Sequence, residues 1–154
     1  MVSDGAGNYG VVKTSSFVGW LIRLGTFSRW NHAVISIGDG KIVEALTRGV
    51  VISPQDKYPI IAWNRHESLS DEKRAIIVAR ALSLVGEPYG FFDIALLALR
   101  ILGLKIFAEK FLGKLARTRG YICSELVAEC YAIPEMGEAY LVTPENLAER
   151  ILYL

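Results

Sequence analysis

The sequence is poor in the residues that build metal centres and disulfide frameworks, with two cysteines and two histidines among 154 residues. It contains neither a CxxC pair nor an HExxH motif, so the common zinc spacings are missing and we expect no metal. Cys123 and Cys130 fall on one predicted helix, roughly 10 Å apart along its axis, which is too far for a disulfide. Both are therefore expected to be free thiols, and the sequence predicts no cofactor.

An excess of charge of either sign is also missing. Seventeen Lys and Arg residues stand against sixteen Asp and Glu residues, the formal net charge is +1, and the basic residues are scattered. There is no Gly-rich phosphate loop, because GAGNYG near the start neither follows a predicted strand nor opens a predicted helix. Nucleic acid is therefore not an expected partner.

Long hydrophobic runs are absent too. The most apolar stretch, residues 91–104, is interrupted by Asp93 and Arg100 and is shorter than the ~20 residues that span a bilayer. The start, MVSDGAGNYGVV, lacks the basic opening and apolar core of a secretory signal. We expect a cytoplasmic protein by default, with a phage-delivered or released product as the alternative, and a single domain over residues 1–154.

Several elements can be read from the periodicity of the chain. HAVISIGDGKIVEA, starting at His32, has two β-branched runs around Gly38-Asp39-Gly40 and predicts a hairpin. A further strand is expected over residues 58–63. Ser70 is a candidate N-cap for a helix from Asp71 to about Val85 that ends at Gly86. Its expected apolar stripe consists of Ala75, Val78, Leu82 and Val85.

The remaining predicted elements are helical. Short helices are expected around residues 18–24, over residues 92–102 and 104–115, at Cys123, and from Thr143-Pro144 towards Leu152. Strands come first and helices follow, so the fold class is α+β.

Cys123 is the candidate nucleophile. A thiol needs a lowered pKa, a nearby base and exposure, and a helix start provides unpaired N–H groups and the positive end of the helix dipole. The same N–H groups can hold an oxyanion that forms on a substrate. The alternative for Cys123 is a small buried hydrophobe, and Cys130, which follows Leu126, Val127 and Ala128, fits that description well.

His32 is the candidate base. It begins a predicted strand, whereas His66 lies in the charged stretch NRHESLSDEK, which is typical of an exposed loop. The alternative is a partly buried strand histidine with ordinary hydrogen-bond partners.

Glu44 is the candidate that orients the imidazole. A three-residue loop at Gly38-Asp39-Gly40 would place Val34 opposite Glu44 and His32 one step along on the same face. A two-residue loop would place Glu44 on the opposite face. A solvent-facing strand carboxylate is the alternative, and periodicity alone does not separate the two.

The order of these motifs, with WNHAVISIGDGKIVEA early and YICSELVAECY late, resembles the circularly permuted branch of the NlpC-type papain-like cysteine peptidases. That branch includes YiiX-like proteins and relatives of lecithin retinol acyltransferase. The resemblance extends to GEPYGFFDIALLAL and LVTPENLAERI. It implies a permuted papain-like fold, with a small antiparallel sheet or partial barrel packed against helices.

The resemblance also implies a triad of Cys123, His32 and Glu44, with Tyr121, Tyr89 and Trp30 as candidate substrate-binding residues. The acyltransferase relatives have His at the third position and Asn before the cysteine, where this chain has Glu44 and Ile122. The expected activity is therefore hydrolysis of an amide or peptide bond through a thioester, with cell-wall peptides as the implied substrate class. The alternatives are a lipid thioesterase or acyltransferase, suggested by the apolar segments, and a non-catalytic binding module.

Overall fold

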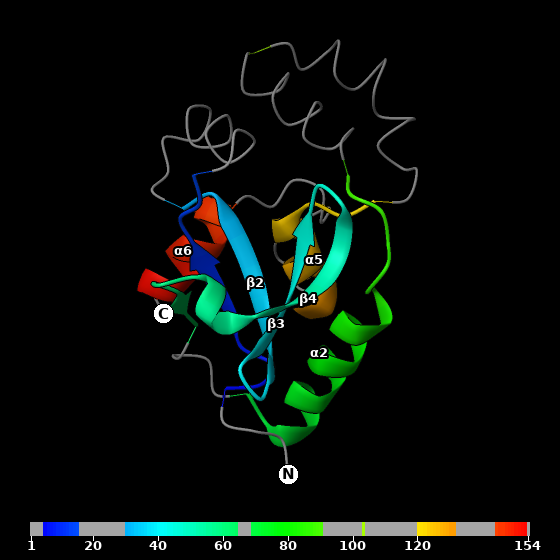
Figure 1. Ribbon diagram of the computed structural model, residues 1–154. Helices are drawn as coiled ribbons and strands as arrows, with labels where there is room; N and C mark the ends of the chain where they lie inside the picture. The colour runs from blue at the N-terminus through cyan, green and yellow to red at the C-terminus, as the bar shows by residue number, and fades with distance from the viewer. Residues whose placement is uncertain are drawn as a thin grey trace.

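The computed structural model describes residues 5–15, 30–64, 69–90, 103, 120–131 and 144–153. Within them the fold is α+β, with a five-stranded antiparallel sheet packed against helices (Figure 1). The strands are β1 (Tyr9–Val12), β2 (His32–Gly38), β3 (Lys41–Leu46), β4 (Gly49–Pro54) and β5 (Ala62–Trp63). The helices are the short 3-10 turn η1 (Gln55–Lys57), α2 (Asp71–Ser83), α5 (Cys123–Tyr131) and α6 (Pro144–Tyr153).

The sheet has the order β4-β3-β2-β1-β5, so β2 lies at its centre. The predicted hairpin is confirmed as β2 and β3, and β4 continues it as a meander. β1, which the sequence analysis did not predict, pairs along β2 from Tyr9 opposite Ile35 to Val12 opposite His32. Four of the five strands are therefore neighbours in sequence as well as in space.

The turn between β2 and β3 combines the two expected alternatives. Gly38 pairs with Lys41 across a two-residue turn at Asp39 and Gly40, both of which have positive φ, as this hairpin turn requires. A bulge between Ser36 and Gly38 then shifts the register by one residue. Val34 therefore faces Glu44, as the three-residue loop predicted, although the turn itself has two residues.

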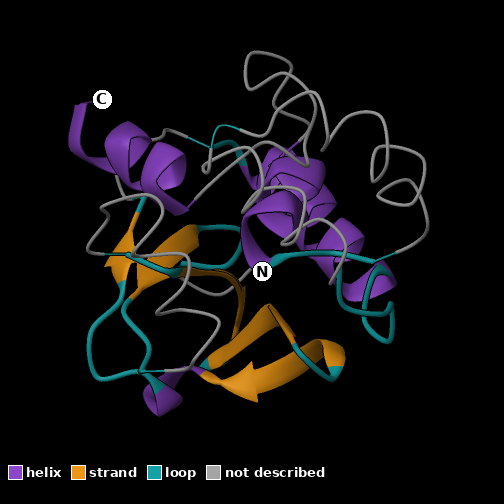
Figure 2. Ribbon diagram, turned by 90° about the horizontal axis from the view of Figure 1, so that it is seen from above, coloured by secondary structure: helices purple, strands orange, loops and turns teal. Residues whose placement is uncertain are grey.

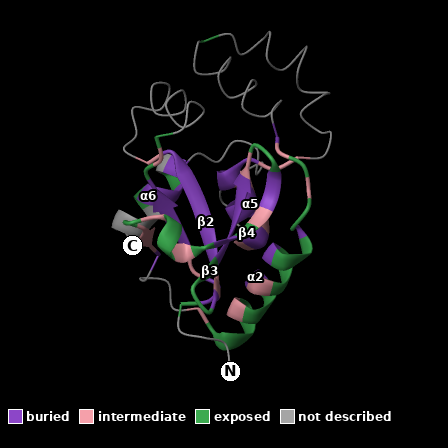
Figure 3. Ribbon diagram, viewed as in Figure 1, coloured by how far each residue is buried: buried purple, intermediate pink, exposed green. Residues whose placement is uncertain are grey.

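The main core lies between one face of the sheet and the helices α2, α5 and α6, which form a layer on that side (Figure 2). β2 and β3 contribute Ala33, Ile35 and Val43, and α5 contributes Leu126 and Val127. A smaller apolar cluster on the other face joins Val12, Val34 and Ile42 to the segment that carries Tyr58, Ile61 and Trp63. The central strands and α5 are buried, whereas α2 turns one side to solvent (Figure 3).

Helix α2 confirms one prediction and corrects another. Ser70 is its N-cap and accepts a hydrogen bond from the Lys73 backbone N–H at 3.3 Å. The predicted stripe of Ala75, Val78, Leu82 and Val85 is wrong: three of these residues are exposed and Val78 is half-buried. The buried positions are Ile77, Ala81 and Leu84, one helical face away. Apolar residues on both faces made the pattern ambiguous, and packing against α5 selected one of them.

Other predicted elements differ in extent or lie outside the described residues. The strand expected over residues 58–63 is reduced to Ala62–Trp63: residues 58–61 form bends and loop, and Pro59 lacks the N–H that strand pairing needs. The last helix begins with Pro144 as predicted. The helices expected over residues 18–24, 92–102 and 104–115 lie outside the described residues. No helix in the described part of the chain is long and apolar enough to cross a membrane.

Candidate active site

Three elements bring the predicted triad together. His32 is the first residue of β2, Glu44 lies in the middle of the neighbouring β3, and Cys123 is the first residue of α5. α5 packs behind β2 and β3, so its first residue meets the end of the sheet where β2 begins (Figure 1). The chain thus assembles, from residues far apart in sequence, the set of side chains that the sequence analysis selected.

The start of β2 is fixed by its neighbour Asn31. This buried side chain accepts a hydrogen bond from the Thr14 backbone N–H at 2.7 Å and donates one to the Thr14 carbonyl oxygen at 2.8 Å. The backbone N–H of Asn31 also donates to the carbonyl oxygen of Val12. These hydrogen bonds of Asn31 therefore fix the backbone directly before His32. The sequence analysis did not assign this role to Asn31.

Glu44 is fully buried and accepts a hydrogen bond from His32, with Nε2 and Oε2 2.8 Å apart. Lys57 and Tyr58 also donate to this carboxylate. The Lys57 ammonium bonds Oε1 at 2.6 Å, and the Tyr58 hydroxyl donates to Oε2 at 2.5 Å. A buried carboxylate with this many donors is stable only in its charged form.

The pKa of Glu44 agrees with these contacts. Burial raises the pKa of this carboxyl, but hydrogen bonds from His32, Lys57, Ser53 and Tyr58 outweigh burial and hold the pKa well below its usual range. Because an ionised carboxylate can only accept hydrogen bonds, His32 Nε2 must be the donor in their contact. Nδ1 is then the ring nitrogen left to face another group.

That group is the Cys123 thiol. Burial raises the pKa of Cys123, but the charge and hydrogen bond of His32, together with the backbone N–H groups of Ala33 and Ser124, bring the pKa below its ordinary value. For His32, burial lowers the pKa. The charge and hydrogen bond of Cys123 and the contact with Glu44 outweigh burial and raise the pKa of His32 to about 9. The two side chains therefore favour a thiolate and an imidazolium beside each other.

In the first turn of α5 a backbone N–H group points at the Cys123 sulfur. Leu126 N–H bonds the carbonyl oxygen of Ile122, which makes Ile122 the N-cap residue, directly before the first helical residue, Cys123. Its side chain carries no oxygen and cannot cap the helix in the way that Ser70 caps α2. The Ser124 N–H is directed at the sulfur instead. This use of the first turn is what nucleophilic catalysis requires of a cysteine.

The segment before Cys123 is anchored by the GEPYG turn that follows α2. Tyr89 and Tyr121 form a parallel bridge, with hydrogen bonds from Gly90 N–H to the Tyr121 oxygen and from Tyr121 N–H to the Pro88 oxygen. The backbones approach so closely that a Cβ on Gly120 would lie 2.9 Å from Gly90. This contact fixes the path by which the chain reaches Cys123.

The three predicted substrate-binding residues differ in position. Tyr89 is near the sulfur: burial raises the pKa of its hydroxyl, and the charge of Cys123 raises it further. The pKa of Tyr121 is also raised, by burial first and then by the charge of Glu129, and Arg80 beside it acts in the opposite direction. Trp30 is half-buried against the main core. Substrate binding by all three stays a prediction.

Lys57 and Tyr58 are the residues that the sequence analysis missed. They stand at the end of η1 and directly after it, and the Tyr58 ring centroid lies 5.9 Å from that of His32. Their only signal in the sequence was a Lys-Tyr pair at the start of the expected strand, with Tyr58 as its first residue. That signal is weak because their role depends on how η1 folds back over β3.

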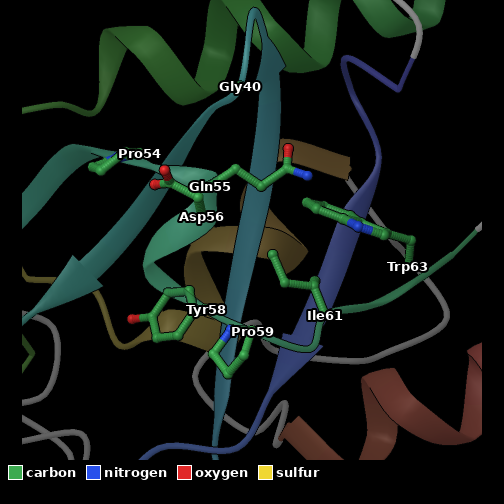
Figure 4. A pocket seen from close by; sticks show the side chains of 8 residues that line it. All are labelled: Gly40, Pro54, Gln55, Asp56, Tyr58, Pro59, Ile61 and Trp63. Atoms are coloured by element: carbon green, nitrogen blue, oxygen red, sulfur yellow. The ribbon is translucent and has the colours of Figure 1, made fainter.

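A hollow of about 450 Å³ lies on the sheet face opposite the main core, over η1 and the chain that follows it. Figure 4 shows its lining: Gly40, Pro54, Gln55, Asp56, Tyr58, Pro59, Ile61 and Trp63. Tyr58 belongs both to this hollow and to the triad, whereas Cys123 and His32 do not line it. The hollow is therefore next to the triad rather than part of it.

The candidate nucleophile and the candidate base are both covered by protein. Cys123 is 2% exposed and His32 is 7% exposed. Among the described residues, no cluster of three or more His, Cys, Asp or Glu side chains is arranged to hold a metal ion. His66, the other histidine of the chain, lies outside the described residues.

Comparisons with known proteins add no family to this picture. No protein-family model matches the chain, and no curated protein matches it. The functional argument therefore depends on the geometry of the site and on the motifs of the sequence.

Proposed function

We propose that this protein is a cysteine hydrolase that cleaves an amide or peptide bond through a thioester on Cys123. The observation that carries the proposal is the chain of contacts from Glu44 to His32, at 2.8 Å, and from His32 to the Cys123 thiol at the start of α5. A nucleophile, a base and a group that orients the base are the parts that such a reaction needs.

In the proposed reaction the Cys123 thiolate attacks the carbonyl carbon, and the negative charge moves to the carbonyl oxygen. Backbone N–H groups at the start of α5 stabilise this oxyanion. The imidazolium of His32 gives its proton to the leaving amine, the C–N bond breaks, and a thioester remains. His32 then takes a proton from water, which attacks the thioester and releases the acid and the Cys123 thiolate.

The finer fold assignment belongs to the same proposal. The order of the motifs, with histidine on an early strand and cysteine on a late helix, supports a circularly permuted papain-like fold of the NlpC type. The antiparallel sheet with α5 packed on one face agrees with that arrangement. Cell-wall peptides are the substrate class that follows from this resemblance.

An acyl probe on the intact protein tests the proposal. A small activated ester should acylate Cys123 at neutral pH, and water should discharge the adduct over repeated turnovers. Cys123→Ala should abolish the adduct and Cys130→Ala should leave it unchanged, as located by peptide mapping in a mass spectrometer. An adduct on Cys130 alone would contradict the assignment, and an adduct on Cys123 that never hydrolyses would exclude a hydrolase.

The burial of both reacting groups favours a second candidate, a binding module that keeps the triad without turnover. With Cys123 only 2% exposed, substrate must reach the sulfur through a rearrangement of the groups that cover it. If native protein is not acylated but the unfolded chain is acylated on both cysteines, the binding module is the better description.

A further inference from the structure

Glu44 has more partners than a triad needs. Its Oε2 accepts from His32 Nε2 at 2.8 Å and from the Tyr58 hydroxyl at 2.5 Å, while Oε1 bonds the Lys57 ammonium at 2.6 Å. Ser53 on β4 adds a further hydrogen bond. The carboxylate that orients His32 is thus itself held by side chains from two other elements.

Lys57 and Tyr58 reach Glu44 from a short, well-anchored turn. The Gln55 N–H at the start of η1 bonds the Gly40 oxygen of the hairpin turn at 2.8 Å, and the Tyr58 N–H bonds the Gln55 oxygen at 3.2 Å. The Lys57 ammonium also lies 5.1 Å from the centre of the Tyr58 ring. Two consecutive side chains therefore act on both oxygens of one carboxylate.

We propose that Lys57 and Tyr58 are positioning residues of this centre: Tyr58 fixes the carboxylate so that His32 Nδ1 faces the sulfur, and Lys57 sets the pH range of the Cys123–His32 ion pair. This inference rests on the proposed function, because it assigns roles towards the same thiol. Neither residue touches the reacting atoms: Tyr58 acts through Glu44, and Lys57 acts through Glu44 and through the field of its charge.

The argument for Lys57 is electrostatic. A positive charge near the pair favours formation of the thiolate and disfavours retention of the imidazolium proton. Removing the charge of Lys57 therefore raises the pH at which the Cys123 thiolate forms and the pH at which the His32 imidazolium loses its proton. These two values are the lower and upper pH limits of the ion pair. The Lys57 side chain is 36% exposed, so solvent screens its field and the shift is moderate.

The argument for Tyr58 is geometric. Burial raises the pKa of the Tyr58 hydroxyl first, and Glu44 raises it further, so this hydroxyl stays protonated and always donates. It bonds the same oxygen as His32 Nε2, which fixes the direction from which the imidazole approaches. In the described structure Glu44 bonds His32, the charge of Cys123 acts on Tyr58 and Tyr89, and Lys57 reaches the pair through its contact with Glu44.

The test measures the rate of Cys123 alkylation by iodoacetamide against pH, which needs no substrate. Lys57→Met should move the lower midpoint upward by roughly half a pH unit to one unit. Lys57→Arg, which keeps the charge, should restore the original profile. The matched control is Lys41→Met, which removes an exposed lysine from the start of β3 and should change nothing.

Tyr58→Phe tests the second role in the same assay. The maximal rate should fall about tenfold, while the midpoint moves less than in Lys57→Met, because a neutral donor is lost rather than a charge. Thermal unfolding of each variant separates this loss from loss of fold. If Lys57→Met does not fold, Lys57→Gln, which keeps a donor to Oε1 without the charge, must give the same upward shift.

The outcomes separate the two proposals. If wild-type Cys123 titrates like an ordinary thiol, the proposed function fails whatever the variants do. If Cys123 has a lowered midpoint in the wild-type protein and the same midpoint in the uncharged Lys57 variants, the role assigned to Lys57 is wrong. An unchanged maximal rate in Tyr58→Phe would overturn the role of Tyr58.

Discussion

Cys123 and Cys130 lie on the same helix, α5, but the pKa values of their thiols are shifted in opposite directions. Cys123 opens α5, where His32 and the N–H groups of Ala33 and Ser124 bring the pKa of its thiol below the ordinary value. Cys130 lies further along α5, where burial raises the pKa of its thiol to about 12. Both side chains are almost completely buried, so exposure does not explain the difference.

What separates the two thiols is the polarity of the groups that cover them. Burial acts against the charged form at both positions. At Cys130 the charges of Arg80 and Glu129 act in opposite directions and burial prevails. At the helix start burial is outweighed, because His32 is both a cation and a hydrogen-bond partner and backbone N–H groups are directed at the sulfur. A buried cysteine therefore becomes a candidate nucleophile only when the fold supplies these partners.

Removing the base should produce the largest change. An ordinary cysteine thiol has a pKa of about 8.5. In the wild-type protein, alkylation of Cys123 should already be fast at a pH well below that value. His32→Ala removes the cation that lowers the pKa of Cys123 and leaves the burial that raises it, so the midpoint should move above that of a free thiol. At pH 7 we expect a loss in rate of roughly 100-fold or more.

Alkylation rates against pH, followed by mass spectrometry of each cysteine, measure this change. The matched control is His66→Ala, which removes the other histidine of the chain and should leave the Cys123 profile in place. If both alanine variants keep the low midpoint, the difference between the two thiols does not come from His32.

Removing the charge of Glu44 should have the next largest effect, and mainly on stability. Glu44→Gln keeps the volume but places an amide among donors, leaving His32 and Lys57 without a buried counter-charge. We expect a loss of about 2 kcal/mol in the free energy of unfolding, below the full cost of breaking a buried pair because Lys57 is partly exposed.

Urea unfolding of Glu44→Gln measures this loss in the free energy of unfolding. The control is Glu149→Gln, on the exposed side of α6. The Cys123 midpoint should also rise, since the imidazolium loses its acceptor. Equal stability of the two variants would mean that the contacts of Glu44 contribute no net stability.

The smallest effect is expected at Cys130. Cys130→Ala removes one buried sulfur from the contact of α5 with the core, which should cost about 1 kcal/mol in the free energy of unfolding. Thermal or urea unfolding measures this cost, and acylation of Cys123 by the ester probe should be unchanged. A variant that unfolds normally but loses acylation would show that the second thiol takes part in the chemistry.

The hairpin shows how far local sequence reaches. Gly38-Asp39-Gly40 between two β-branched runs predicted two antiparallel strands, and β2 and β3 are these strands. The facing of Val34 and Glu44 was predicted as one of two registers. Local rules did not separate them, because the bulge between Ser36 and Gly38 corrects the register that a two-residue turn alone would impose.

Helix α2 and the residues around Glu44 show where local sequence stops. The buried face of α2 was chosen wrongly because Ile76, Leu82 and Val85 are apolar but exposed. Lys57 and Tyr58 were not found because η1, which precedes the expected strand, turns them over β3. In both cases the decisive contact is with a partner distant in sequence, which periodicity cannot reveal.

The sequence by itself determined the α+β class, the hairpin, the N-cap of α2 at Ser70 and two candidate side chains, Cys123 and His32. These follow from turn residues, capping residues and the scarcity of histidine and cysteine, all of which are local or compositional. The tertiary structure alone decided the register that sets Glu44 beside His32, the contacts of Lys57 and Tyr58 with Glu44, the environment that sets the two thiols apart and the buried face of α2. The physical reason is that hydrogen bonds, charges and burial act through space, and only the folded chain brings β2, β3, η1 and α5 within their range.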